Sequence, residues 1–248
     1  TTNWTDVDVT TTFVNNEAAC EALNTTAITD PNFEQALIDL GYDSGTINGS
    51  VPTANISGIK SLYVSNYNIT DLTGIEDFIA LTFLSCSSNQ LTSLDVSTNT
   101  ALTTLYCSSN QLTSLDVSTN TALTILICEF NQLTSLDVSK NTALTTLDCR
   151  SNQLTSLDVS NNTALTYLNC YSNQLTSLDV SNNTALTSLS CSSNQLTSLD
   201  VSTNTALLYL FCQSNQLTSL DVRNGNNTNF TNFYSTNNPN LTCIFVDD

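Results

Sequence analysis

The amino-acid sequence predicts a solenoid of stacked right-handed coils, predominantly β, behind an N-terminal helical cap. The segment NQLTSLDVS begins at Asn89, returns at Asn110 and continues to recur every 21 residues. Leucines and one cysteine keep fixed places in each copy, whereas a few positions between them vary. A fixed period of this length is the signature of a repeat architecture, in which each unit packs only on its neighbours.

The chain divides into four regions on this pattern. Residues 1–27 carry no clear period and are expected to be an N-terminal tail or a linker from an upstream region. Residues 28–58 are expected to form the helical cap, residues 59–228 the repeats, and residues 229–248 a degenerate closing repeat that caps the C-terminal end. Repeat arrays need such caps because their terminal units otherwise expose an apolar edge.

The N-terminal cap contains one clear helix signal, ITDPNFEQALIDLG. Asp30 is suited to the N-cap and Pro31 to the first helical position, while Gly41 is placed to end the helix. Phe33, Leu37 and Leu40 fall on one face of this helix. We expect that face to cover the first coil of the array.

Each repeat contains two apolar edges. Leu105 and Cys107 are expected to point inward from a short strand, and Leu115 and Val117 from the opposite wall of the coil. Neighbouring coils would stack at about 4.8 Å, giving a parallel sheet of eight or nine strands. Two series of asparagines, typified by Asn110 and Asn99, would occupy the turns and satisfy backbone groups of adjacent coils. In the closing repeat, the positions of the LTSLDV apolar residues are taken by Leu241, Ile244 and Val246.

Seven of the nine cysteines fall once per repeat, each in the place of an apolar core residue. This spacing predicts buried free thiols and no metal site, because histidine and CxxC spacing are absent. Cys20 and Cys243 lie outside the series and are the candidates for disulfides, although their positions near opposite ends of the array argue against a bond between them. The seven repeat cysteines are Cys86, Cys107, Cys128, Cys149, Cys170, Cys191 and Cys212.

The charge balance excludes two classes of partner. The 248 residues include 22 acidic and 4 basic side chains, a net charge of -18. Such a surface repels nucleic acid and anionic lipid. No apolar run approaches the roughly 20 residues of a membrane helix, so membrane insertion is not expected. The opening TTNWTDVDV is no signal peptide, which indicates a mature or trimmed chain.

The motif LxxLxCxxNxL, as in Leu102 to Leu112, resembles that of leucine-rich-repeat proteins. The 21-residue length and the irregular first unit resemble the bacterial, internalin-like subtype, and arrays of NQLTSLDVS are similar to those of secreted and surface proteins of Bacteroidetes. The resemblance covers residues 28–248. It implies a parallel sheet on the concave face, extended strands on the convex side, and an extracellular protein, secreted or attached to the cell surface, that binds through the concave face.

The positions that vary between copies are those that this fold would expose on the concave sheet. Against a background of Ser and Thr, they place an apolar and aromatic strip beside a single arginine, a composition typical of protein-binding hot spots. Rings on a rigid sheet would also suit stacking on sugars, and the alternative is strand packing without a ligand. The candidate ligand-binding residues are Phe83, Tyr106, Ile125, Ile127, Glu129, Phe130, Asp148, Arg150, Tyr167, Asn169, Tyr171, Tyr209 and Phe211.

A column of aspartates is the other candidate feature. The aspartate of each LTSLDV points outward, and carboxylates about 4.8 Å apart repel by about 1 kcal/mol in water. Hydrogen bonds from neighbouring residues are favoured as the compensation over calcium, which prefers six to eight oxygens. We therefore expect no cofactor, with calcium as a weak alternative at Asp95, Asp116, Asp137, Asp158, Asp179, Asp200 and Asp221.

Catalysis finds little support, since the chain has no histidine, no GxSxG and no phosphate loop. Glu129 and Asp148 lie one coil apart, but a charged surround for Arg150 is favoured over a glycosidase pair. The sequence thus predicts an extracellular binding or adhesion module, not an enzyme, that recognises a protein or a surface glycan. A spacer or stalk in a larger surface protein is the alternative, and an ice-binding face of Thr and Ser rows is a third.

Overall fold

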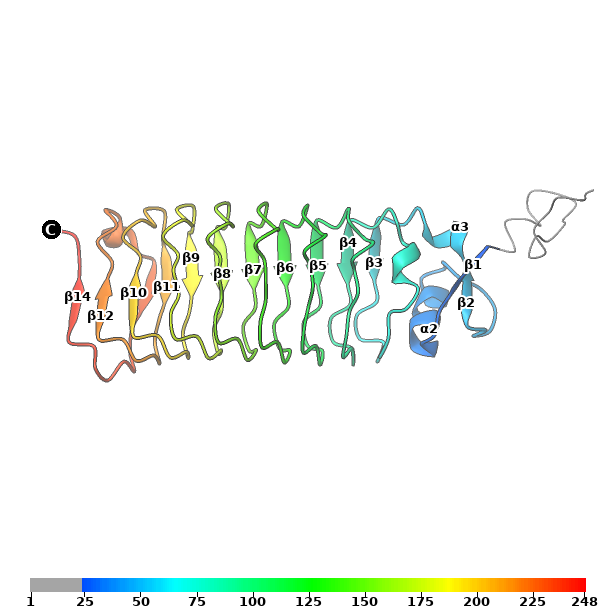
Figure 1. Ribbon diagram of the computed structural model, residues 1–248, viewed down its shortest axis with the longest axis horizontal. Helices are drawn as coiled ribbons and strands as arrows, with labels where there is room; N and C mark the ends of the chain where they lie inside the picture. Colours follow the sequence, from blue (N-terminus) through cyan, green and yellow to red (C-terminus); the bar gives the residue numbers. More distant parts are fainter. Residues whose placement is uncertain (1–23) are drawn as a thin grey trace, which may run out of the picture.

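A computed structural model describes residues 24–248 and shows a solenoid whose coils succeed one another along a single axis (Figure 1). Its main sheet has nine parallel strands in the order β13-β11-β9-β8-β7-β6-β5-β4-β3, so each strand pairs with that of the next coil. The predicted sheet of eight or nine strands is confirmed. The strands are β3 Ser61–Tyr63, β4 Phe83–Ser85, β5 Thr104–Tyr106, β6 Ile125–Ile127, β7 Thr146–Asp148, β8 Tyr167–Asn169, β9 Ser188–Ser190, β11 Tyr209–Phe211 and β13 Asn232–Tyr234.

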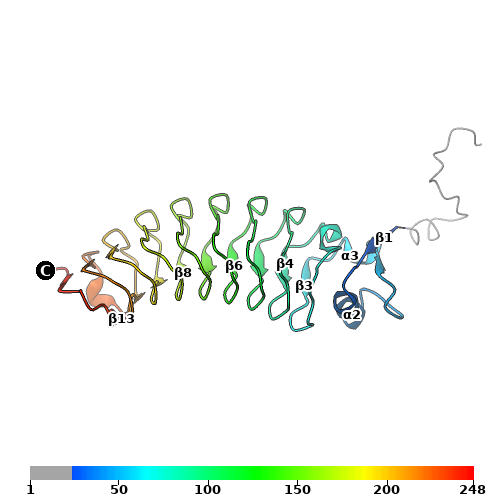
Figure 2. The ribbon, with the colours of Figure 1, turned by 60° about the horizontal axis from the view of Figure 1, so that its bottom comes forward.

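The opposite wall of each coil is formed by the LTSLDV segment. Near the C-terminus this wall becomes a second parallel sheet of three strands, β10 (Ser198–Asp200), β12 (Ser219–Asp221) and β14 (Cys243–Phe245). Figure 2 shows that the array is bent and that strands such as β4, β6 and β8 lie toward the inner side of the bend. The nine-stranded sheet is therefore the concave face.

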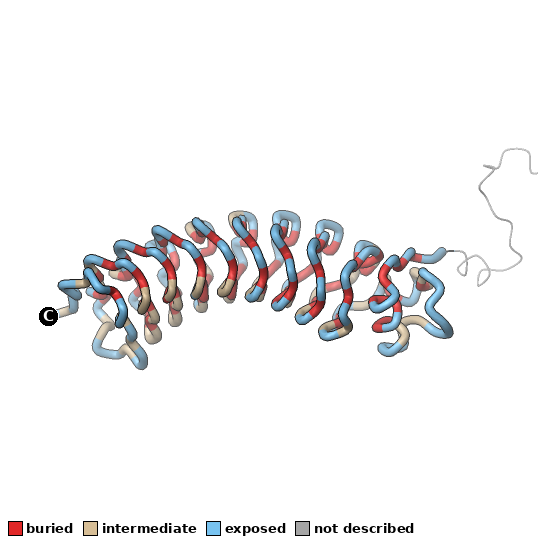
Figure 3. The backbone as a smooth tube through the Cα atoms, turned by 90° about the horizontal axis from the view of Figure 1, so that it is seen from below, coloured by how far each residue is buried: buried red, intermediate tan, exposed pale blue. Residues whose placement is uncertain are grey.

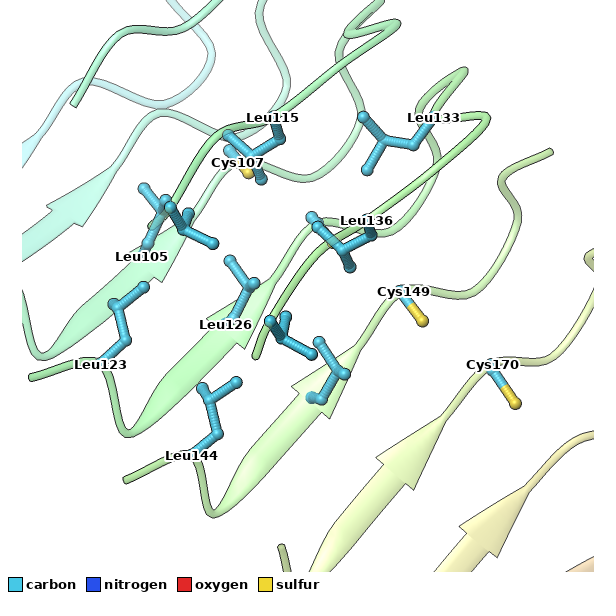
Figure 4. Packing of buried hydrophobic residues seen from close by; sticks show 14 of the residues in the cluster. Leu105, Cys107, Leu115, Leu123, Leu126, Leu133, Leu136, Leu144, Cys149 and Cys170 are labelled. Atoms are coloured by element: carbon cyan, nitrogen blue, oxygen red, sulfur yellow. The ribbon is translucent and has the colours of Figure 1, made fainter. Parts of the chain in front are cut away.

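The core lies between the two walls and is continuous through all the coils. The strands pair in register, so that Leu105 lies beside Leu84 on one side and Leu126 on the other. Buried and exposed segments alternate along every coil (Figure 3). Figure 4 shows Leu115 and Leu136 of one wall facing the leucines and cysteines of the other. The central leucine of every strand from β3 to β11 in the main sheet is fully buried, which identifies the unvarying letters as scaffold.

The first asparagine series joins adjacent coils. Asn131 donates from Nδ2 to the carbonyl of Cys128 at 3.1 Å and to that of Cys107, one coil earlier, at 3.0 Å. Its Oδ1 accepts the N–H of Leu112 at 3.0 Å. The expected structural role is confirmed, and the same three contacts recur at Asn110, Asn131, Asn152, Asn173, Asn194 and Asn215.

In the second asparagine series, only the nitrogen of each side-chain amide forms hydrogen bonds. Asn120 donates from Nδ2 to the carbonyls of Val96 and Asn99 at 2.9 and 3.0 Å. Its Oδ1 is buried and has no hydrogen-bond partner among residues 24–248. The same orphaned oxygen recurs at Asn99, Asn120, Asn141, Asn162, Asn183 and Asn204. This series therefore stabilises the turn at the expense of one desolvated acceptor per coil.

The seven repeat cysteines are buried free thiols, as the spacing predicts. Burial raises the pKa of the Cys107 and Cys212 thiols to about 12. They therefore act as small apolar residues with a weak donor, and Cys86 Sγ lies 3.5 Å from the carbonyl of Tyr106. Cys243 is free and exposed, whereas Cys20 lies outside the described residues.

The N-terminal cap is built around helix α2 (Pro31–Asp39). Asp30 caps it by accepting the N–H groups of Asn32 and Phe33 at 2.7 and 3.1 Å. Phe33 and Leu37 are buried as expected, but Leu40 is 36% exposed because the helix ends one residue before it. The turn at Gly41 has a φ of +77°, the left-handed conformation that ends the helix.

Short elements complete the cap. Strands β1 (Thr25–Ala27) and β2 (Ser50–Pro52) pair antiparallel, so residues 25–27 belong to the cap and not to the tail expected from the sequence. Helix α3 (Thr53–Ile56) comes directly after β2, and single 3-10 turns, η1 (Ile75–Asp77) and η2 (Asn227–Asn229), lie near the two ends of the array. None of the helices between residues 24 and 248 has the length and apolarity to cross a membrane.

The C-terminal end departs from the expected cap. Ile244 lies in register beside Leu220, which is the predicted place. However, Ile244 is 37% exposed and Val246 57% exposed, whereas Leu220 is fully buried. The closing repeat continues the coil geometry, but no described residue covers its outer side.

Candidate binding surface on the concave sheet

The concave sheet presents two columns of side chains, from the first and third residues of each strand. The third-residue column is fixed by the strand register and includes Ser85, Tyr106, Ile127, Asp148, Asn169, Ser190 and Phe211. None of the predicted aromatic or aliphatic residues is fully buried, which agrees with an outward orientation. Contacts among the large side chains of the sheet define three groups.

The first group, the N-terminal aromatic cluster, consists of Tyr63, Phe83 and Tyr106. The ring centroids of Tyr63 and Phe83 are 4.7 Å apart, and those of Phe83 and Tyr106 are 5.4 Å apart with an edge-on geometry. Such pairs stabilise each other beyond simple burial. Tyr63 is 57% exposed and is absent from the residues that the sequence predicts, although IKSLYVSN aligns with LTTLYCSSN and places Tyr63 with Tyr106.

The second group, the Arg150 cluster, consists of Glu129, Phe130, Asp148, Arg150 and Asn169. Arg150 Nε forms an ion pair with Glu129 Oε2 and lies 3.8 Å from Asp148 Oδ2. The guanidinium carbon lies 5.5 Å from the centre of the Phe130 ring. The expected carboxylate surround of Arg150 is thus present. Because Nε makes both ion-pair contacts and the side chain is 36% exposed, the outer edge of the guanidinium remains available.

Asp148 and Asn169 are among the ligand-binding residues predicted from the sequence, but in the structure they support other side chains and do not face a ligand. Both are only 5% exposed, because strands a few ångströms apart allow longer neighbouring side chains to cover shorter ones. Asn169 Nδ2 donates to Asp148 Oδ2 and to the hydroxyl of Tyr167, each at 3.2 Å. Burial raises the pKa of Asp148 above its usual value, and the charge and N–H of Arg150 oppose that rise. These two residues hold Arg150 and Tyr167 in position.

Phe130 occupies an unusual backbone conformation. Its φ is +52°, a left-handed value that bulky residues seldom adopt, and its side chain is 51% exposed. The equivalent position has the same conformation in the other coils, where it is Asn66 in the first coil, Asn237 in the last, and serine in the six between: Ser88, Ser109, Ser151, Ser172, Ser193 and Ser214. The chain therefore holds its one exposed phenylalanine of this series at a strained position, directly against Arg150.

The remaining predicted residues are spread along the sheet. Ile125 and Ile127 are half-buried beside the Arg150 cluster. Tyr171 is 40% exposed and lies on the coil that follows that of Arg150. Tyr209 and Phe211 lie further away, beyond strand β9, which we call the serine-only strand because both of its outward residues, Ser188 and Ser190, are serine. Phe211 stacks on Tyr234, with ring centroids 5.5 Å apart, and forms the third group, the C-terminal aromatic pair. Tyr234 escapes prediction because its repeat is degenerate in sequence.

The aspartate column lies on the opposite wall and is stabilised locally. Asp116 Oδ1 accepts the N–H of Ser118 at 2.8 Å, and each of the other aspartates accepts from the residue two positions later. Hydrogen bonding to Ser118 lowers the pKa of Asp116, which keeps the carboxylate charged. No group of three metal-ligating side chains occurs in residues 24–248. The geometry therefore favours hydrogen-bonded carboxylates over the calcium alternative.

Comparisons with known proteins agree on the fold. Residues 79–120 and 142–183 match the family of leucine rich repeats (2 copies). Internalin C2 from Listeria monocytogenes is 23% identical, with a TM-score of 0.72 over 89% of this chain and 97% of that one. A leucine-rich-repeat protein from Leptospira interrogans is 27% identical, with a TM-score of 0.64 over 68% of this chain and 46% of that one. Among curated proteins, no sequence matches.

A further similar structure is the functional domain of InlJ from Listeria monocytogenes, which is described as including a cysteine ladder. It is 30% identical over 90% of this chain, with a TM-score of 0.42. The present chain spans 62% of the InlJ domain and 46% of the Leptospira protein. The solenoid is therefore a leucine-rich-repeat fold similar to that of internalin C2, and this fold is typical of protein-binding modules.

Proposed function

We propose that this leucine-rich-repeat solenoid is an extracellular binding module whose concave sheet recognises another protein through the Arg150 cluster. Phe130 is the observation that carries the proposal. An exposed aromatic ring at a left-handed backbone position costs on the order of 1 kcal/mol or more of stability, and the other coils carry only serine or asparagine there. Together with Arg150, the ring supplies the residue types that dominate protein-binding hot spots.

The arrangement of the rings supports a protein over a glycan. Sugar stacking needs flat rings that stand apart, whereas Tyr63, Phe83 and Tyr106 pack against one another at tilted and edge-on angles. The buried Asp148 and Asn169 are directed to Arg150 and Tyr167 and not to solvent, so few hydroxyl-binding groups remain. A partner with a carboxylate and an apolar side chain would match the open guanidinium edge and the Phe130 ring.

Substitutions that restore the repeat background test this proposal with little risk to folding. Phe130→Ser and Arg150→Ser introduce the serine that other coils carry at the same positions, as in Ser109 and Ser108. Tyr209→Ser, beyond the serine-only strand, is the matched control. Surface and secreted proteins and a glycan array are to be screened with the wild type. We expect a protein ligand whose binding falls at least about 30-fold in both cluster variants and little in the control.

A glycan signal that is lost in the same two variants would instead assign the surface to carbohydrate. If every interaction of the wild type survived both cluster substitutions, the concave surface at Arg150 would not be the binding site.

Deletion of single repeats separates a binding surface from a stalk. Removing residues 144–164 deletes Asp148 and Arg150 while preserving the 21-residue register. Removing residues 186–206 deletes the serine-only strand β9 and spares the Arg150 cluster. A binding module loses affinity only with the first deletion, whereas a spacer tolerates either equally.

A further inference from the structure

The C-terminal edge of the opposite wall is built like an internal coil but is uncovered by residues 24–248. Within residues 24–248, strand β14 is the last strand of its sheet and pairs on one side only, with β12. Ile244 and Val246 are 37% and 57% exposed, whereas the residues at the same places one coil earlier, Leu220 and Val222, are 0% and 2% exposed. The edge thus presents unpaired backbone groups beside apolar side chains, which is a template for one more strand.

A segment of this same chain carries the pattern of the missing strand. Residues 4–9 read WTDVDV, which aligns with the repeated LTSLDV. Thr5, Asp8 and Val9 are identical to the repeat, and the three inward places are taken by Trp4, Val7 and Val9. Residues 1–23 lie outside the described part of the structure, so this match is one of sequence.

We propose that residues 4–9 of one copy add to strand β14 of a second copy as its next parallel strand. Continuing the register of Leu220 with Ile244, Val7 would lie beside Ile244 and Val9 beside Val246. Trp4 would cover Leu241, which is half-buried at the same edge. The added strand would satisfy the backbone edge and bury the apolar places that the closing repeat leaves open.

The reach of the chain favours a second copy over the same one. Strand β1, which begins at Thr25, lies at the N-terminal cap, and β14 lies at the opposite end of the array (Figure 1). Eight strand spacings of about 4.8 Å make the nine-stranded sheet about 38 Å long before the cap is added. Fourteen residues, the number from 10 to 23, span at most about 50 Å when fully extended, and a route within one chain would have to pass the cap as well. The contact is therefore head-to-tail, a geometry that builds chains of copies.

A designed crosslink tests both the partner and the register. In the proposed pairing, Asp6 lies directly beside Cys243, because Cys243 holds the place of Ser219 in the coil before. Adjacent strands place the two Cα atoms at a distance that a disulfide accepts. An Asp6→Cys variant, with Cys20→Ser to remove the competing thiol, is to be oxidised with glutathione disulfide. We expect disulfide-linked dimers and longer chains, and none after Cys243→Ser.

Sedimentation equilibrium without crosslinking supplies the second readout. We expect the wild type to associate as its concentration rises, and Val7→Asp or Ile244→Asp to weaken association by about 100-fold, because each would place a carboxylate in the apolar contact. Both positions are outside the core of the described fold, so the variants remain folded by circular dichroism. A crosslink formed within a single chain would overturn the second-copy assignment. A wild type that stays monomeric at every concentration, with no crosslink, would overturn the proposal altogether.

Discussion

The ring of Phe130 lies 5.5 Å from the guanidinium carbon of Arg150, and the backbone that holds it there has a φ of +52°. Six other coils reach the same backbone conformation with serine. Two effects of similar magnitude therefore oppose each other at Phe130. The left-handed backbone is strained, which destabilises the fold, and the attraction between the guanidinium and the aromatic ring stabilises it.

Replacing Phe130 by asparagine should separate stability from binding. Asparagine tolerates the left-handed conformation, so the strain is relieved while the contact with Arg150 is lost. We expect the free energy of unfolding to stay level or rise by up to about 1 kcal/mol, and ligand binding to fall. Urea denaturation measures the first effect. A loss of more than about 1 kcal/mol would show that the ring stabilises the fold and is not held there against strain.

The Asp148 carboxyl should give the protein a pH-dependent stability of unusual sign. Its pKa is raised in the folded state, mainly by burial, so the folded protein retains a proton that the unfolded chain releases near pH 3.8. The stability from this group is full below that pH and is lost as the pH rises through the folded pKa. We expect Asp148→Asn to remove this loss. The free energy of unfolding of the variant, measured by urea denaturation, should therefore increase relative to that of the wild type as the pH rises.

Asp158→Asn is the matched control with the opposite sign. Hydrogen bonding to Ser160 lowers the pKa of Asp158. Its contribution is therefore present above pH 3.8 and is lost as the pH falls. If the two variants showed the same pH trend, the burial of Asp148 would not be the cause.

The two asparagine series should differ in their effect on stability. Asn131→Ala removes four hydrogen bonds and leaves the N–H of Leu112 unpaired in the core, so we expect a loss of about 3–5 kcal/mol. Asn141→Ala removes two hydrogen bonds and also an orphaned oxygen, so we expect a loss of about 2 kcal/mol. Gln132→Ala, at an exposed neighbour, should change little. Equal losses at the two asparagines would contradict this assignment.

The thiols should react in two classes. In a Cys20→Ser background, Cys243 is the exposed thiol and the seven repeat thiols are buried, with pKa values raised by burial. We expect one thiol to react with a disulfide reagent in the native protein at pH 8, and eight after denaturation. Rapid reaction of several thiols in the native protein would show that the coils open readily.

The scaffold was predictable from sequence because packing constrains it. Leu105 and Cys107 recur in every copy, and nothing but a buried place in a stacked coil explains such regularity. The site was predictable only as a set of residues without their contacts. Whether Asp148 faces a ligand or is covered depends on the size of side chains on adjacent strands, which belong to other coils. The exposure of Ile244 depends on whether another segment packs over it, and the repeat pattern carries no information on that contact.

The uniform register of the concave sheet has a consequence for how such proteins diversify. Since every coil packs on the next through the same buried side chains in the same register, insertion or loss of one repeat requires no repacking in the other coils. The separation between the Arg150 cluster and either end group can thus be adjusted in steps of a single strand spacing, about 4.8 Å. Gain or loss of whole repeats in the gene would therefore change the distance between neighbouring groups of side chains while leaving each group intact.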